Sequence, residues 1–369
     1  MKLPRFGVEE WLNVHEKSAI YDIAGVSIDS LTLDELFDLT GTDAQAFFKE
    51  LAHKKLNYGW IEGSPQFKQA AASLYDHIKP ENILQTNGAT GANMLVLYAL
   101  VEAGDHVISL YPSYQQLYDI PRSLGAKVDF WQIREELNWL PDLDELRQLI
   151  KPSTKMICIN NANNPTGAVM DEPYLKELVE IAKSCDAYIL SDEVYHSFSD
   201  KKVPAIADLY DKGVSVNSLS KTYSLSGIRV GWVAANRQVT NLLKDYRDYT
   251  MICAGVFDDM VASLALDHRD KILERNQKIV SRNLTILQEW VASEEMAELI
   301  APVHVSTSFV KLKVNLDIED FCLKLLQDYG VLVVPGNRFD IEGHVRIGYC
   351  CSTEILKEGL RRLSQCLHN

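Results

Sequence analysis

Short apolar runs alternate with helix-like runs through the middle of this 369-residue chain, and this rhythm restricts the fold more than any other feature. Six apolar runs have the length of buried strands, at residues 106–110, 127–131, 155–159, 188–192, 214–218 and 229–235. Helix-like segments such as 143–150 and 174–184 lie between some of them. Such alternation is typical of a mostly parallel sheet covered by helices. The sequence therefore predicts an α/β domain.

The C-terminal part follows a different pattern. A long helical stretch at about residues 263–293 precedes strand-like runs at 308–314, 331–334 and 344–349 and helix-like runs at 317–328 and 353–367. These runs predict a smaller α+β unit joined to the large domain by the long helix. Near the N-terminus, Ser64 and Pro65 form a cap and first-turn proline, which predicts a helix from there to about residue 79.

Composition excludes several classes of protein. Hydrophobic residues make up 47% of the chain and charged residues 24%, as in ordinary globular proteins rather than disordered ones. The net charge of −14 disfavours nucleic acid or an anionic membrane surface as a partner. Residues 1–6 lack the apolar core of a signal peptide, and the longest apolar run, 94–101, is too short to span a bilayer.

The seven cysteines indicate neither a metal site nor a disulfide framework. They are scattered and odd in number, at positions 158, 185, 253, 322, 350, 351 and 366, and no Cys-x-x-Cys occurs. We therefore expect no bound metal and a reducing, cytoplasmic location.

The run from residue 218 to 231 offers an unusual set of reactive groups. It contains the amine of Lys221, the hydroxyls of Ser218 and Ser220, and the guanidinium of Arg229, directly after a strand-like run. A lysine amine can react with an aldehyde. Hydroxyls and an arginine can hold a phosphate, the arginine through its planar fork. This set suits a small carbonyl cofactor that carries a phosphate.

Three further motifs lie upstream of that run. They are Asn-Asn-Ala-Asn-Asn-Pro-Thr-Gly at 160–167, Tyr-Ile-Leu-Ser-Asp-Glu-Val-Tyr at 188–195, and Thr-Asn-Gly-Ala-Thr-Gly at 86–91. Each alone has an ordinary interpretation, as a turn, a helix cap or a glycine-rich loop. Asp192 lies 29 residues before Lys221 (221 − 192), and the four motifs point to one site because they occur in the order found in a known family.

Together these motifs resemble those of the class I/II aminotransferases, which are pyridoxal 5'-phosphate (PLP) enzymes of fold type I. The lysine motif matches as small-x-small-Lys, a small residue three positions later, and Gly-x-Arg-x-Gly. The resemblance covers essentially the whole chain. It implies a large PLP-binding domain of residues 31–284, and a small domain made of residues 1–30 and 285–369.

The resemblance also implies roles around the cofactor. Asp192 would keep the ring nitrogen protonated, because an opposite charge favours the charged form; Glu193 would point to the other face of the extended segment. Asn164 and Tyr195 would donate to the ring oxygen, which makes Lys221, Asp192 and Tyr195 the candidate catalytic residues. The phosphate would be held by backbone N–H groups and side chains of Gly88, Ala89, Thr90, Ser218, Ser220 and Arg229.

Three residues complete the predicted site. Tyr114, in a Tyr-Pro-Ser-Tyr segment, would stack on the cofactor, and Arg346 would bind the substrate α-carboxylate together with Asn164. Tyr58 resembles the tyrosine that reaches the phosphate of the neighbouring subunit, which implies a homodimer with shared active sites. Gly25 lies in a stretch that departs from the family pattern and is given no role.

The predicted function is transfer of an amino group between an amino acid and a 2-oxo acid by a ping-pong mechanism. A lyase, racemising or cyclising enzyme of amino-acid metabolism would use the same lysine, aspartate and arginine. A non-catalytic ligand-sensing protein is the alternative from another class, although this acidic chain lacks an added basic region. The sequence does not identify the substrate; a dicarboxylate would need a second cation, and Arg5, Arg122 and Arg247 are available.

Overall fold

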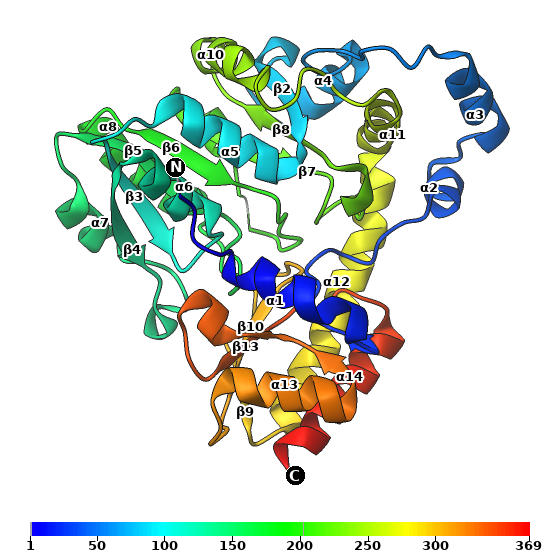
Figure 1. The fold of residues 1–369 in the computed structure, drawn as a ribbon, viewed down its shortest axis with the longest axis vertical. Coiled ribbons are helices and arrows are strands. Elements are labelled where there is room, and N and C mark those ends of the chain that lie inside the picture. Colours follow the sequence, from blue (N-terminus) through cyan, green and yellow to red (C-terminus); the bar gives the residue numbers. More distant parts are fainter. Residues whose placement is uncertain (1, 202) are drawn as a thin grey trace.

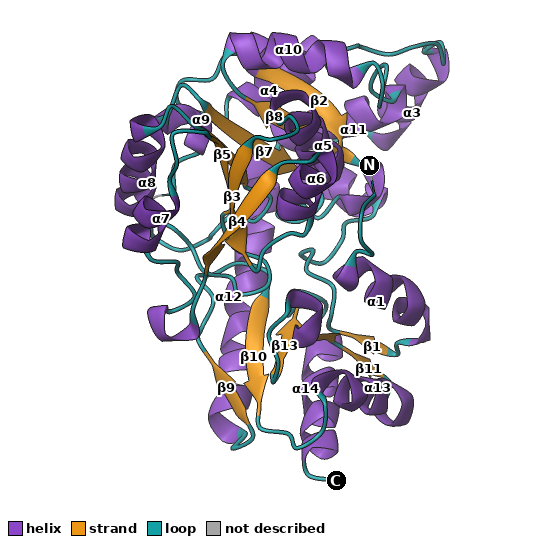
Figure 2. Ribbon diagram, turned by 60° about the vertical axis from the view of Figure 1, so that its left-hand side comes forward, coloured by secondary structure: helices purple, strands orange, loops and turns teal. Residues whose placement is uncertain are grey.

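A seven-stranded sheet forms the centre of the computed structural model, which describes residues 2–201 and 203–369 (Figures 1 and 2). The strand order is β2-β8-β7-β6-β5-β3-β4. The strands are β2 (Ile83–Asn87), β3 (His106–Tyr111), β4 (Lys127–Gln132), β5 (Thr154–Asn160), β6 (Tyr188–Asp192), β7 (Gly213–Ser218) and β8 (Val230–Ala234). Strands β3 to β7 pair in parallel, and β8 runs antiparallel to both β2 and β7. The predicted α/β fold with a mostly parallel sheet is confirmed.

Helices cover both faces of this sheet, because successive strand side chains point to opposite sides. In β5, Met156 and Cys158 pack with helices α5 (Gly88–Leu100), α6 (Gln116–Leu124) and α10 (Arg237–Arg247). Ile157 and Ile159 face the other side, with α7 (Leu143–Leu149), α8 (Glu172–Ser184) and α9 (Ile206–Leu209). Both faces are therefore buried, which explains why the central strands are continuous apolar runs.

A smaller unit of strands and helices follows in the C-terminal part. Strands β12 (Val334–Pro335), β13 (His344–Ile347), β10 (Ser308–Leu312) and β9 (Ala297–Leu299) form an antiparallel sheet in that order. The N-terminal strand β1 (Tyr21–Asp22) pairs in parallel with β11 (Val331–Leu332). Helices α13 (Ile318–Tyr329) and α14 (Thr353–Leu367) lie beside these strands.

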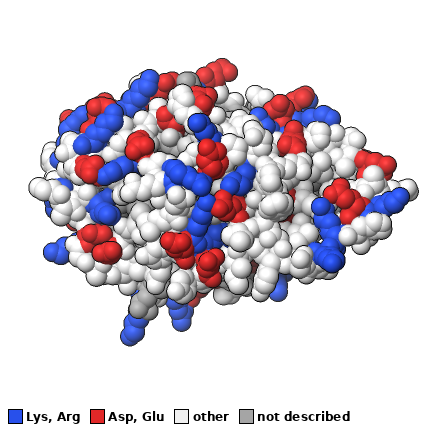
Figure 3. All heavy atoms as spheres, turned by 90° about the horizontal axis from the view of Figure 1, so that it is seen from above, with Lys and Arg blue, Asp and Glu red and all other residues white. Residues whose placement is uncertain are grey.

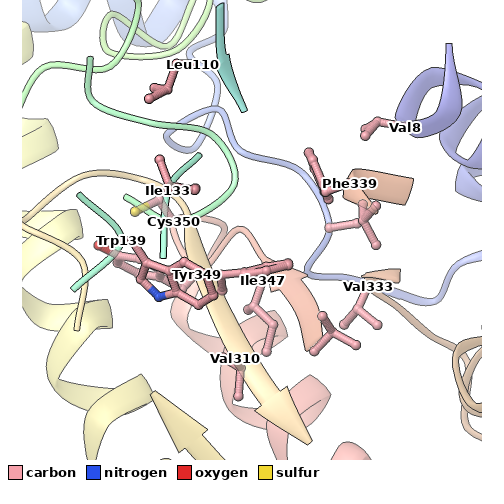
Figure 4. Close-up of a cluster of buried hydrophobic side chains, with 14 of the residues drawn as sticks. Val8, Leu110, Ile133, Trp139, Val310, Val333, Phe339, Ile347, Tyr349 and Cys350 are labelled. Atoms are coloured by element: carbon pink, nitrogen blue, oxygen red, sulfur yellow. The ribbon is translucent and has the colours of Figure 1, made fainter. Parts of the chain in front are cut away.

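The two parts share one hydrophobic core. Figure 4 shows Ile133 and Trp139 from the large-sheet side beside Cys350 and Tyr349 of the smaller unit, all buried in one cluster. Helix α12 (Arg269–Ser293) runs from one part to the other (Figure 1). The predicted domain boundary at residues 284 and 285 lies inside this helix, so the division into two domains stays a prediction.

The remaining helices lie in the N-terminal region and beside the large sheet: α1 (Gly7–His15), α2 (Leu33–Thr40), α3 (Ala44–His53), α4 (Pro65–Ala72) and α11 (Val256–Asp267). The side chain of Ser64 caps α4 as expected, but the helix ends at Ala72 rather than near residue 79. The reason is a tertiary contact, because the carboxylate of Asp208 accepts hydrogen bonds from the backbone N–H groups of Asp76 and His77.

The surface seen from above mixes acidic and basic side chains (Figure 3). Within residues 2–201 and 203–369, we find no helix with the length and apolar character that a membrane span requires.

Candidate active site

A pocket of about 570 Å³ opens where the parallel strands β5, β6 and β7 end. Ligands of open α/β sheets bind at the carboxyl ends of the strands. Eleven of the predicted site residues line this pocket: Ala89, Thr90, Tyr114, Asn164, Asp192, Tyr195, Ser218, Ser220, Lys221, Arg229 and Arg346. The structure therefore brings together residues that are up to 257 positions apart (346 − 89).

Asp192 is a buried carboxylate at the end of β6. Its side chain accepts hydrogen bonds from Asn93 Nδ2 at 2.7 Å and from the backbone N–H of Val194 at 3.3 Å. Burial raises its pKa to about 6. Within the described part of the chain it forms no salt bridge, and it lines the pocket, where a cationic group could lie beside it.

Two residues beside Asp192, Glu193 and Asn93, differ in where their side chains lie. Glu193 faces the other side of the sheet, as expected, where Oε1 accepts from the N–H of Ile206 at 2.9 Å and from Ser215 Oγ at 3.0 Å. Asn93, which orients Asp192, was not predicted. The available signal was an amide inside an otherwise apolar helical run, and this amide is fully buried.

Lys221 lies in the connection between β7 and β8, and both ends of this loop are fixed. The N–H of Leu219 donates to the carbonyl of Val230, and the N–H of Leu225 donates to the carbonyl of Leu219, each at 3.0 Å. Burial lowers the pKa of Lys221 to about 8, helped by the positive charges of Arg346 and Arg229. A larger fraction of this amine is therefore neutral near pH 7 than of an ordinary lysine.

An anion-binding cradle lies at the start of α5. The helix begins at Gly88, and the preceding Asn87 makes no side-chain cap, so the first N–H groups stay available. Gly88 has φ +66°, and a Cβ atom there would lie 2.7 Å from Nη2 of Arg229. The Arg229 guanidinium also donates to the carbonyl of Ser226 at 2.9 Å. Its close approach requires glycine at position 88 and adds positive charge to the helix N-terminus.

Arg346, in β13, is a second buried cation and is 2% exposed. Its Nη1 donates to Asn164 Oδ1 at 3.2 Å and its Nη2 to the carbonyl of Ala24 at 3.0 Å. Its Nε has no hydrogen-bond partner, and no carboxylate among the described residues forms a salt bridge with it. Burial lowers its pKa, and an entering carboxylate would offset that cost.

Of the three tyrosines predicted for the site, Tyr114 and Tyr195 line the pocket and Tyr58 does not. The hydroxyl of Tyr114 lies 3.3 Å from Thr90 Oγ1, and burial raises its pKa to about 12. Tyr195 is 6% exposed, and burial raises its pKa as well. Tyr58 does not join them: its side chain is 77% exposed and lines a separate surface pocket. A single chain therefore does not bring Tyr58 to the site.

These features fit pyridoxal 5'-phosphate. The cradle at Gly88 suits a phosphate, the isolated carboxylate of Asp192 suits a protonated ring nitrogen, and the amine of Lys221 suits an aldehyde. Among residues 2–201 and 203–369, no group of three or more His, Cys, Asp or Glu side chains is arranged to hold a metal.

Comparison with known proteins agrees with a site for pyridoxal 5'-phosphate. The family model for "Aminotransferase class I and II" matches residues 39–363. The chain is 31% identical to an aspartate aminotransferase of Pyrococcus horikoshii, over 88% of each chain. The crystal structure of a PLP-dependent aminotransferase from Streptococcus suis is 69% identical with a TM-score of 0.99, covering 100% of this chain and 98% of that one. A PLP-dependent cyclase, OrfR, is 26% identical with a TM-score of 0.91 and the same coverage.

Proposed function

Since this chain belongs to the class I and II aminotransferase family, we propose a role for each residue of the pocket in the reaction. The protein is a PLP-dependent enzyme that moves an amino group between an amino acid and a 2-oxo acid. The observation that carries the assignment of roles is that Lys221, Asp192 and Arg346 line one pocket.

The first group of residues holds the cofactor. The N–H groups of residues 88–90 and the side chains of Ser218, Ser220 and Arg229 bind its phosphate. Asp192, oriented by Asn93, keeps a proton on the ring nitrogen. Asn164 and Tyr195 donate to the ring oxygen, and Tyr114 packs against the ring. When bound, PLP supplies an acceptor for the electron pair released at the substrate Cα.

Lys221 and Arg346 act on the substrate. Arg346 binds the α-carboxylate through its fork, beside Asn164, and thereby fixes the orientation of the Cα–H bond. Lys221 takes the proton from Cα and would deliver it to the cofactor's C4' carbon rather than back to Cα, a task for which a pKa of about 8 is suited. The fixed ends of its loop limit how far the amine can move.

The reaction type is tested by separating the two half-reactions. Purified enzyme mixed with an amino acid alone should form one equivalent of 2-oxo acid per active site. Adding a second 2-oxo acid should then restore the starting absorbance and release the new amino acid, with the parallel-line kinetics of a ping-pong mechanism. Turnover that requires both substrates bound at once would contradict it.

Cyclisation is the second candidate, and the similarity to the cyclase OrfR favours it. The same Lys221 and Asp192 would serve, because the outcome depends on which substrate bond breaks. Mass spectrometry of the products separates the candidates. A cyclase would release a ring-closed product without consuming a 2-oxo acid.

Replacing Arg346 by lysine should weaken both amino acids and 2-oxo acids by about tenfold or more, because the charge stays but the bidentate fork is lost. The measurement is kcat/KM for an amino acid compared with a simple amine that lacks the carboxylate. The amine should change little. Equal weakening of both compounds would make Arg346 a structural residue.

We also propose that the active unit is a homodimer in which Tyr58 completes the partner's phosphate site. Support comes from the exposure of Tyr58 on a surface that also exposes apolar side chains, among them Leu56 (85%), Trp60 (58%) and Ile61 (61%). Contiguous exposed apolar residues mark interaction surfaces. Twofold symmetry is the default for a soluble homo-oligomer.

Mixing two inactive variants, Tyr58→Ala and Lys221→Ala, should restore part of the wild-type activity. One site of the heterodimer then has both its lysine and its tyrosine, while the other lacks both. Activity is measured after subunit exchange has been confirmed by mass spectrometry. Full activity of Tyr58→Ala alone, or no recovery despite exchange, would count against a shared site.

We propose a cytoplasmic location as well. It is supported by the seven cysteines, all of which carry free thiols in the structure, and four of which are buried. Free thiols persist in a reducing compartment.

A further inference from the structure

Helix α1 forms one wall of the pocket, and hydrogen bonds fix it on two sides. The N–H of Gly7 donates to Gln115 Oε1 at 2.8 Å, on the side of the large sheet. The indole Nε1 of Trp11, whose side chain is 1% exposed, donates to the carbonyl of Val333 at 2.8 Å, on the side of the smaller unit. In Figure 1, α1 lies between these two parts of the molecule. Its residues therefore have defined positions at the pocket.

The face of α1 that lines the pocket combines apolar and acidic residues. Val8, Glu9 and Leu12 of α1 line it at the spacing expected for one side of a helix, and Glu16, the residue directly after the helix, lines it as well. The carboxylates of Glu9 and Glu16 form no salt bridge with any residue that the structure describes. This wall thus presents negative charge on an apolar surface.

The neighbouring Glu10 does not line the pocket and is paired with arginines, unlike Glu9. Its carboxylate bonds to Arg5 at 2.5 Å and to Arg338 at 3.5 Å. Glu9, one residue earlier, has no such cation. The negative charge of Glu9 acts on both cations of the site. It raises the pKa of Lys221 and of Arg346, although burial lowers both pKa values by more.

Each of the four cationic side chains that line the pocket has either a proposed role or a carboxylate partner. Lys221, Arg229 and Arg346 have the roles proposed above, and the fourth, Arg338, bonds to Glu319 at 2.6 Å as well as to Glu10. A substrate with a second carboxylate would thus find, among the described residues, no arginine at this wall whose Nη atoms lack a carboxylate partner; the one donor left on Arg338 is its buried Nε.

The three arginines considered from the sequence lie outside the pocket. Arg5 has a side chain that is 86% exposed, Arg122 pairs with Asp119, and Arg247 is buried against backbone carbonyls of Gln85 and Ile252. They do not supply the missing cation.

Resting on the aminotransferase function proposed above, we infer that α1 selects amino acids with a cationic side chain, and that Glu9 is the specificity-determining residue. The alkyl stem of such a side chain packs along Val8 and Leu12, and its guanidinium or ammonium group meets the Glu9 carboxylate, with Glu16 adding negative charge at the end of the face.

The first test compares isosteric substrates that differ in charge. Wild-type enzyme should favour L-arginine over its neutral isostere L-citrulline by about tenfold in kcat/KM, since one charged hydrogen bond corresponds to roughly that factor. L-aspartate should be a poorer donor than either. Glu9→Gln should bring the arginine-to-citrulline ratio close to one. Glu10→Gln, which removes the same charge from the same helix, should keep the wild-type ratio, because Arg338 still has Glu319.

The second test measures binding without turnover. The amine-free analogues 5-guanidinopentanoate and 5-ureidopentanoate are titrated into the holoenzyme by calorimetry. The guanidino compound should bind about tenfold more tightly to the wild type and to Glu10→Gln, but not to Glu9→Gln. Raising the salt concentration should reduce the difference, as expected for a partly exposed charge pair.

The outcomes separate this inference from the proposed function. If citrulline or aspartate reacts as well as arginine while the two half-reactions proceed, the selectivity is wrong and the aminotransferase function stands. A ratio that Glu9→Gln leaves unchanged also overturns the inference. If no amino acid undergoes the half-reaction although the guanidino analogue binds through Glu9, the inference stands and the reaction type is wrong.

Discussion

Replacing Lys221 by alanine should lower turnover by about 10⁴-fold or more, because the variant loses the group that moves the Cα proton. The measurement is the rate of the first half-reaction, followed by absorbance with a saturating amino acid. The cofactor should still bind through the cradle at Gly88, since those contacts do not involve the lysine. Lys212→Ala is the matched control, a lysine that pairs with Asp186 at the surface.

The same variant should be no less stable than the wild type when both lack the cofactor. The pKa of Lys221 is lowered from 10.5 to about 8, so its charged form is disfavoured by folding. That cost, up to about 3 kcal/mol, is fully present below pH 8 and disappears as the pH rises towards 10.5. Urea unfolding at pH 7 and at pH 10 checks the sign. Retained turnover, or a large loss of stability at pH 7, would contradict the proposed role.

Asp192→Asn should lower turnover by at least about tenfold to a hundredfold while changing cofactor affinity much less. The side chain keeps its size and its bond to Asn93 but loses the charge that holds the ring proton. Stopped-flow measurement of the half-reaction gives the rate, and equilibrium dialysis gives the affinity.

The free energy of unfolding of the same variant should not fall, although its turnover does. Burial raises the pKa of Asp192 from 3.8 to about 6, so ionising it costs up to about 3 kcal/mol above pH 6 and nothing below pH 3.8. The cofactor-free Asp192→Asn protein should therefore be at least as stable as the wild type at pH 7. Glu193→Gln is the control: it changes the adjacent carboxyl group on the other face and should leave turnover within a few-fold. Wild-type turnover in Asp192→Asn would remove Asp192 from the proposed role.

The sheet and the cofactor side of the site were predictable because they depend on local patterns. An apolar run such as 188–192 has both the length and the end point of a buried strand, so the position of Asp192 followed directly. The Lys221 loop carries its chemistry within one short segment. Strand β2 was missed because five residues with polar Gln85 and Thr86 do not look like a buried strand, although both side chains are buried here.

Other parts depend on contacts that no local pattern encodes. Glu9 and Glu10 are both acids in the first turn of a helix, an arrangement that capping alone explains. Only the fold separates them, by turning Glu10 towards Arg338 and Glu9 towards the pocket. Helix α4 ended early for the same kind of reason, since Asp208, over 130 positions away, fixes the turn at Asp76.

The nine-residue helix α1 has a consequence for how this enzyme can change over time. The groups proposed to act on the cofactor lie on the large sheet and its loops, whereas the wall at Val8, Glu9 and Leu12 belongs to a separate element held through Gly7 and Trp11. Substitutions on that wall replace none of the residues proposed to hold the phosphate or the ring, and only Glu9 among them acts on the pKa of Lys221. A duplicated gene can therefore acquire a new substrate by drift within one short segment while the residues proposed for the chemistry are kept. Libraries randomised at positions 8, 9, 12 and 16 offer the same freedom to a protein engineer.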